Sequence, residues 1–207
     1  MLARIVAKTH DLQDAIVLGL PRGGVPVAYE VACQLNLPLD VFIVRKLGVP
    51  GEEELAMGAV ASGGTVVINP SIVHHLGISQ DVVQAAIQRE EIEIKRRERA
   101  YRDGHRPMRI DGRTAILIDD GLATGATMFA AARALQPKAE RVVVAVPVAA
   151  ESACNELRNE VDDVICANTP RDFFAVGAFY RDFSQTTDEE VRTLISKART
   201  RPGLQVA

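Results

Sequence analysis

Two adjacent carboxylates follow a short apolar run in the stretch ILIDDGLATGAT, residues 116–127. Asp119 and Asp120 stand where a strand buried on both faces is expected to end. The small residues at 123–127 then open an alanine-rich helix. Backbone N–H groups in such a turn, with the positive end of the helix dipole behind them, bind phosphate, and two threonine hydroxyls add donors. A phosphate turn beside two acceptors for sugar hydroxyls predicts a ribose 5-phosphate site; the alternative is a solvated strand end and a plain helix start.

A second turn, PRGG at 21–24, lies between an apolar run at 15–20 and a helical pattern. In open α/β sheets this arrangement places a ligand at the carboxyl end of the strand. Gly23 and Gly24 let the backbone approach an anion closely, and Arg22 supplies a forked donor. The turn matches neither a Walker loop nor a GxGxxG motif. It indicates an anion site of another kind, or a plain turn with a surface arginine.

Two cations, Arg45 and Lys46, follow an apolar run that begins at Leu39, and a glycine- and proline-bearing loop at 47–58 is expected after them. Cations at the end of a strand suit a polyanion, although such a pair is also often only solvated. We expect the loop to close over the site and exclude water.

Five apolar runs alternate with helical segments, which favours an α/β fold with a twisted, mostly parallel five-stranded core sheet and helices on both faces. Ser62-Gly63-Gly64 indicates a hairpin, and 79–102 has the pattern of one long helix. The core strands are expected at 15–20, 39–44, 116–118, 141–148 and 161–167. We expect one domain over 1–207, with its core at about 12–167, a flexible loop and hairpin at about 46–70, and a C-terminal hood segment and helix at about 168–200.

The composition is that of an ordinary soluble globular protein, with 207 residues, 47% hydrophobic and 25% charged, and a formal net charge of -3. This charge gives no general reason to bind nucleic acid or an acidic membrane surface. No apolar run approaches the roughly 20 residues of a membrane span, and the first residues lack a signal-peptide core. Cys33, Cys154 and Cys166 are widely spaced, so we expect reduced thiols in a cytoplasmic protein, with neither a disulfide nor a metal site.

The string DDGLATGATM at 119–128 resembles the diphosphoribosyl-binding signature of the type I phosphoribosyltransferases, and it is especially similar to the adenine-using branch. The resemblance implies an enzyme that binds 5-phosphoribosyl 1-diphosphate with Mg²⁺ and transfers the phosphoribosyl group to a nitrogen of a base, releasing diphosphate. Asp119 and Asp120 would bind the ribose hydroxyls and hold the metal weakly, mainly through the ligand and water. The 5-phosphate would be held by Ala123, Thr124, Gly125, Ala126 and Thr127.

Two further segments are similar to phosphate-binding parts of the same family. PRGG resembles its diphosphate loop, often written Ser-Arg-Gly-Gly, which implies diphosphate contacts from Arg22, Gly23, Gly24 and Lys46. VRKLGVPG at 44–51 resembles the Arg-Lys segment and mobile loop of the adenine and orotate enzymes. Because that basic residue often reaches the partner's site, the resemblance implies a homodimer. The catalytic roles that it implies fall on Arg22, Arg45, Lys46 and Glu54, the last near a loop glutamate proposed to protonate the base.

The aromatic-rich segment at 173–183 is similar to the base-stacking region of the 6-oxopurine enzymes, which implies base contacts from Phe174 and Ala175. The chain departs from those enzymes at Ala123, where they carry an aspartate, and in lacking a lysine in the strand before this segment. Pro21 also replaces the serine of the diphosphate loop. The acceptor base therefore stays open.

Two other classes of protein share some of these features. A non-catalytic regulator or sensor on the same fold would bind 5-phosphoribosyl 1-diphosphate or nucleotides without releasing diphosphate. A phosphoryl-transfer protein would use Asp119 and Asp120 as tight Mg²⁺ ligands.

Overall fold

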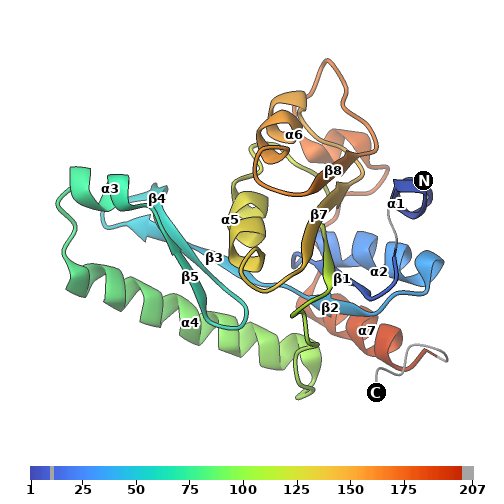
Figure 1. Cartoon of the computed structure of the whole chain (residues 1–207), viewed down its shortest axis with the longest axis horizontal. Coiled ribbons are helices and arrows are strands. Elements are labelled where there is room, and N and C mark those ends of the chain that lie inside the picture. Colours follow the sequence, from blue (N-terminus) through green and yellow to red (C-terminus); the bar gives the residue numbers. More distant parts are fainter. Residues whose placement is uncertain (10–11, 202–207) are drawn as a thin grey trace.

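The core of the protein is a five-stranded, all-parallel sheet with the strand order β2-β1-β6-β7-β8, seen in the computed structural model (Figure 1). The structure describes residues 1–9 and 12–201, and of these it leaves out the side chains of 9, 53 and 54. The strands are β1 (Ala15–Gly19), β2 (Leu39–Val41), β6 (Thr114–Ile118), β7 (Arg141–Val146) and β8 (Asp163–Cys166). The predicted parallel sheet of five core strands is confirmed.

Alternate residues of each strand face opposite sides of the sheet and build two hydrophobic cores. Val17 and Ile116 pack in the core beneath α1, α2 and α7, whereas Ile16 and Leu117 pack in the core beneath α5 and α6. The apolar runs carry no polar alternation because helices cover both faces. The covering helices are α1 (Leu2–Thr9), α2 (Gly24–Leu35), α5 (Ala126–Leu135), α6 (Glu151–Leu157) and α7 (Asp188–Arg199), and a 3₁₀ turn, η1 (Val176–Phe179), precedes α7.

A smaller antiparallel sheet, in the order β3-β4-β5, extends away from the core together with α3 and α4 (Figure 1). Its elements are β3 (Val44–Val49), β4 (Glu52–Ala61), β5 (Thr65–Ile68), α3 (Pro70–His75) and α4 (Gln80–Arg102). The hairpin predicted around residues 62–64 is confirmed, since β4 pairs with β5. The long predicted helix is also confirmed, with Ser79 as its N-cap.

The loop predicted at 47–58 is wrong, because these residues form the second half of β3 and most of β4. Arg45 and Lys46 lie inside β3 and not at the end of a core strand, since β2 ends at Val41. The connection between the paired strands is the two-residue turn Pro50-Gly51, a dipeptide that favours tight turns, and Gly51 has a φ of +86°.

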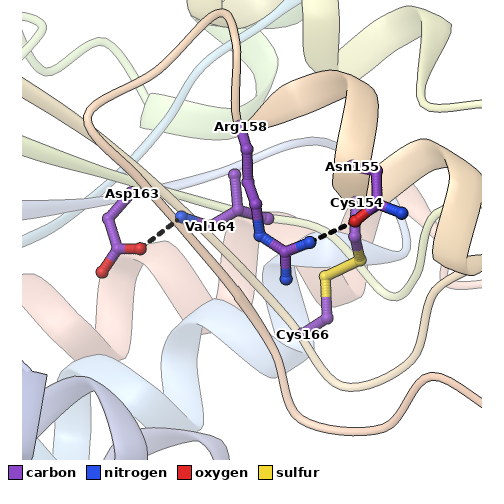
Figure 2. The surroundings of a disulfide bond; sticks show 6 residues. All are labelled: Cys154, Asn155, Arg158, Asp163, Val164 and Cys166. Carbon is purple, nitrogen blue, oxygen red and sulfur yellow. Dashed lines mark hydrogen bonds between the residues drawn. A yellow bond between two sulfur atoms is a disulfide. The ribbon is translucent and has the colours of Figure 1, made fainter.

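Cys154 of α6 and Cys166 at the end of β8 form a disulfide, so the prediction of reduced thiols is wrong for this pair (Figure 2). Cys33 is free. The two cysteines are 12 positions apart in the sequence, and this spacing does not reveal that α6 packs back beside β8.

None of the helices among the described residues is long and apolar enough to cross a membrane.

Candidate functional site

The two glycine-containing turns meet because the strands before them are neighbours. β1 and β6 pair in parallel, with Gly19 opposite Ile118 at their carboxyl ends. The strand order also reverses here, since the chain runs from β1 outward to β2 and later returns to β6 on the other side. In open α/β sheets the crevice at such a reversal is where ligands bind.

The glycines of the PRGG turn allow it to lie directly on the acid pair. A Cβ on Gly23 would lie 2.0 Å from Oδ2 of Asp120, and one on Gly24 would lie 2.6 Å from the carbonyl oxygen of Ile118. Gly23 has a φ of -60°, so close approach, and not a left-handed backbone, is what requires glycine. The peptide bond between Pro21 and Arg22 is cis.

The acid pair is held by backbone contacts and by one tyrosine. Oδ1 of Asp119 accepts the N–H of Asp120 at 2.9 Å, and the hydroxyl of Tyr180 donates to the carbonyl oxygen of Asp120 at 2.5 Å. Burial, together with the neighbouring Asp120 carboxylate, raises the pKa of Asp119 to about 7, and burial also raises the pKa of Asp120. Nearby cations or hydroxyl donors would favour the ionised forms, so ligand binding and proton release are coupled at this pair.

The turn after the acid pair surrounds a cavity of about 190 Å³. Gly125 adopts a left-handed conformation with φ of +70° and caps the N-terminus of α5. Thr124 and Thr127 are exposed and line this cavity. Lys46 and Asp119 complete its polar wall, and Val176 contributes an apolar contact. The cavity therefore combines a helix N-terminus, two hydroxyls and a cation, which suits a phosphate group.

A second cavity, of about 590 Å³, lies on the Asp120 side of the pair. Its wall includes Arg22 and Gly23 of the PRGG turn, and the segment that precedes α7 closes it with Tyr180 and Asp182. Asp119 lines the first cavity and Asp120 lines the second. The acid pair thus stands between two places where anionic groups can bind.

Three residues at this edge carry no local signal strong enough to select them from the sequence. Tyr180 is one of several aromatic residues at 173–183, and Asp182 is one of many exposed acids. Asp188, the first residue of α7, has an oxygen 3.7 Å from Nη1 of Arg22 and accepts the hydroxyl of Tyr101 at 2.9 Å. These contacts join segments far apart in the chain, which periodicity cannot reveal.

Arg45 and Lys46 lie beside the phosphate turn. Lys46 lines the cavity of Asp119, while Arg45 donates from Nε to Glu90 at 2.8 Å and lines a third cavity, of about 470 Å³. Neither of them lines the Arg22 cavity. Glu54 lies in β4, but its side chain is outside the part of the chain that the structure describes.

Phe174 and Ala175 lie at the surface. Phe174 is 87% exposed, and its neighbour Phe173 stacks on Phe179 with ring centroids 5.8 Å apart. Val176, two residues further on, reaches the phosphate cavity, where it also meets Gly121. Base contacts by Phe174 and Ala175 stay a prediction.

Comparisons with known proteins agree with this architecture. The family model for the phosphoribosyl transferase domain matches residues 1–183. Two curated proteins of Mycobacterium tuberculosis, "Putative phosphoribosyl transferase MT0597" (strain CDC 1551 / Oshkosh) and "Putative phosphoribosyl transferase Rv0571c" (strain ATCC 25618 / H37Rv), are each 44% identical over 184 residues. That match covers 88% of this chain but 42% of either relative, so the chain spans less than half their length. The crystal structure of TT1426 from Thermus thermophilus superposes with a TM-score of 0.84 at 41% identity, over 95% of this chain and 93% of that chain.

The sheet order, its helical layers and the crevice at the strand reversal define an α/β protein of the type I phosphoribosyltransferase fold. The chain belongs to the phosphoribosyl transferase domain family, as the DDGLATGATM string predicted.

Proposed function

We propose that this protein is a phosphoribosyltransferase that binds 5-phosphoribosyl 1-diphosphate with Mg²⁺ and transfers the phosphoribosyl group to a nitrogen of a small acceptor. The observation that carries the proposal is the acid pair with an anion site on each side. Asp119 faces the cavity of the phosphate turn, and Asp120 faces the cavity of Arg22. The proposed substrate has the same layout, with a phosphate at one end of a ribose ring and a diphosphate at the other.

In this proposal the residues at 123–127 hold the 5-phosphate through backbone N–H groups and threonine hydroxyls. Asp119 and Asp120 accept the ribose hydroxyls, which fixes the ring across the strand reversal. Arg22 and the backbone at Gly23 and Gly24 meet the diphosphate on the other side.

The transferring carbon then loses its bond to the diphosphate oxygen, and the bonding electrons leave with the diphosphate. The nitrogen lone pair of the acceptor forms the new bond as positive charge develops on the sugar, as in other glycosyl transfers, and the acceptor releases its proton to solvent. Arg22 stabilises the negative charge that accumulates on the departing group. Lys46 reaches the 5-phosphate cavity and adds positive charge there. Direct roles for Arg45 and Glu54 in diphosphate departure or base protonation stay predictions.

The donor set at this edge fits Mg²⁺, which prefers one or two carboxylates together with phosphate oxygens of the substrate. Among the described residues no group of three or more acidic, histidine or cysteine side chains could hold a metal ion alone. Asp119 and Asp120 would therefore hold Mg²⁺ together with the ligand. When bound, the metal supplies charge neutralisation to the diphosphate.

A turnover screen tests the proposal. The purified protein is mixed with 5-phosphoribosyl 1-diphosphate and Mg²⁺, each nucleobase or simple amine is added in turn, and released diphosphate is measured. The proposal expects release with one class of acceptor, and expects Asp119→Asn combined with Asp120→Asn to weaken binding by a few kcal/mol, about two charge-assisted hydrogen bonds. Asp103→Asn, at the C-cap of α4, serves as the matched acid control.

Two results would count against the proposal. Calorimetry that shows unchanged affinity in the double variant would remove the ribose role of the acid pair. Tight binding of 5-phosphoribosyl 1-diphosphate without diphosphate release for any acceptor would favour a regulator on the same fold. A homodimer is also proposed here, and sedimentation at several concentrations tests it.

A further inference from the structure

The third cavity, of about 470 Å³, is set apart by the charge of its wall. Its charged lining is Arg45, Lys46, Arg89 and Glu90, three cations against one carboxylate, and Thr127 adds a hydroxyl. The cavity lies between β3, the middle of α4 and the start of α5. This volume falls within the range of small-molecule sites, about 300–1,000 Å³.

Glu90 gives this cluster a fixed geometry. Its side chain is only 8% exposed, and its two oxygens accept from Nε of Arg45 at 2.8 Å and from Nε of Arg89 at 3.1 Å. A buried carboxylate that holds two guanidinium groups by their Nε edges leaves their Nη edges for another acceptor. Among the described residues, those Nη groups have no protein acceptor. Arg45 is 37% exposed and Arg89 is 71% exposed, so a ligand can reach both.

We infer that this cavity is a second anion site, which takes a phosphorylated small molecule distinct from the sugar phosphate at the phosphate turn. Guanidinium groups bind phosphate through paired N–H donors, and two of them held on one carboxylate present such donors from two sides. Lys46 adds a third cation and brings the net charge of the lining to two positive charges, which matches a phosphate dianion.

The site is coupled to the proposed sugar-phosphate site by shared walls. Lys46 and Thr127 line both cavities. Two dianions that compete for one lysine repel each other, so occupation of either cavity weakens binding at the other. This coupling rests on the proposed function, whereas the second site itself does not. Linkage requires the effect to be equal in both directions.

Calorimetric titration of inorganic phosphate into the full chain, already saturated with ribose 5-phosphate, tests the inference. We expect phosphate to bind in this cavity in addition to any phosphate held in the Arg22 cavity, and Arg89→Gln to weaken only the binding in this cavity, roughly tenfold or more. Arg89→Gln keeps the Arg45–Glu90 pair, so the fold is retained. The matched control is Arg96→Gln on the same helix, which pairs with Glu93 outside the cavity and should leave phosphate binding unchanged.

A second titration reads the coupling. Inorganic phosphate should lower the affinity for ribose 5-phosphate more in the unsubstituted protein than in Arg89→Gln, by roughly fivefold or more. Equal phosphate affinity in Arg89→Gln and in the unsubstituted protein would overturn the inference, as would the absence of any further phosphate binding. If phosphate binding depends on Arg89 while ribose 5-phosphate does not bind at all, the proposed function fails and the second site stands.

Discussion

At the scale of single residues, the electrostatics of Asp119 set a pH dependence of stability. The folded protein raises the pKa of this carboxyl from 3.8 to about 7, first by burial and then by the Asp120 carboxylate. Above pH 7 this buried carboxyl is ionised, which lowers the free energy of unfolding. The cost shrinks as the pH falls from about 7 to 3.8, because the folded protein takes up the proton before the unfolded chain does. A tenfold change in an acid dissociation constant corresponds to about 1.4 kcal/mol, so the whole effect is at most several kcal/mol.

Asp119→Asn should therefore be more stable than the unsubstituted protein at pH 8 and nearly equal to it at pH 4. Its amide oxygen can still accept the Asp120 N–H. Urea unfolding at pH values from 4 to 8, without ligand, measures the difference. Asp182→Asn is the control, because hydrogen bonds from Ser184 lower the pKa of that exposed carboxyl and give no cost at high pH. A difference for Asp119→Asn that stays constant across the pH range would contradict the argument.

Gly23 is the residue at which the smallest substitution should have the largest effect on binding. A methyl group there would overlap Oδ2 of Asp120, at 2.0 Å, and would push this carboxylate away from its place between the two cavities. We expect Gly23→Ala to reduce the affinity for 5-phosphoribosyl 1-diphosphate at least tenfold and to cost about 1–3 kcal/mol of stability through overpacking.

Gly64→Ala separates the two effects of that substitution. Gly64 has a φ of +75° and open space around it, so the variant should lose roughly 1–2 kcal/mol of stability through its backbone alone. Its ligand affinity, measured by the same calorimetry, should not change. Equal losses of affinity in both glycine variants would show that general destabilisation explains the Gly23 effect.

At the scale of elements, a buried ion pair fixes the end of α4 to the sheet. Nε of Arg102 donates to both oxygens of Asp40, at 2.9 and 3.1 Å, and Nη2 donates to the carbonyl oxygen of Val41. Both side chains are almost fully buried. Removing Arg102 leaves Asp40 with only Arg199, 3.7 Å away, as an opposite charge, and also removes the ion-pair partner of Glu98. We expect Arg102→Met to cost about 3–5 kcal/mol in denaturant unfolding.

The matched control is Arg96→Met on the exposed side of α4. Its pair with Glu93 is solvent-screened, so this change should cost about 1 kcal/mol or less. If Arg102→Met were as mild as Arg96→Met, the attachment of α4 would depend on apolar packing and not on the ion pair.

The elements of the core could be predicted because each carries a local pattern. The run at 116–118, the small-residue turn after it and the alternation of runs with helices were sufficient for the sheet, its layers and the crevice. β3 and β4 could not be predicted in the same way, because Lys46 and Glu52 suggest a solvated loop until the second sheet pairs them. The Pro50-Gly51 turn was the available signal for that hairpin.

The residues of the site also fall into those that the sequence predicts and those that it does not. Asp119, Asp120 and the turn after them were selected by type and spacing, and they do line one edge of the sheet. Their neighbours Tyr180 and Asp188 arrive from the C-terminal segment, and only the packing of α7 beside α4 and α2 brings them there. Contacts of this kind depend on the tertiary fold, which no local pattern encodes.

At the scale of the whole molecule, the helix layers on both faces of the core sheet contribute a turn to the ligand site. α2 begins at the PRGG turn on one face, and α5 begins at the phosphate turn on the other. A ligand held by both turns is therefore held by both halves of the core. Binding should raise the resistance of the whole core to unfolding and not only that of one loop.

The disulfide joins α6 to β8, the outer strand of the core sheet. We expect this link to stabilise the folded protein. Cys154 and Cys166 are 12 residues apart, and closing a loop of this size stabilises by roughly 3 kcal/mol or less through the unfolded chain. A reductant should therefore lower the melting temperature of the protein, and of Cys33→Ala, by up to about 10 °C in scanning calorimetry. Cys166→Ala, which keeps the buried Cys154, should melt at the lower temperature with or without reductant. If three thiols react in the untreated, denatured protein, the pair is reduced in solution and the melting temperature should not respond to reductant at all.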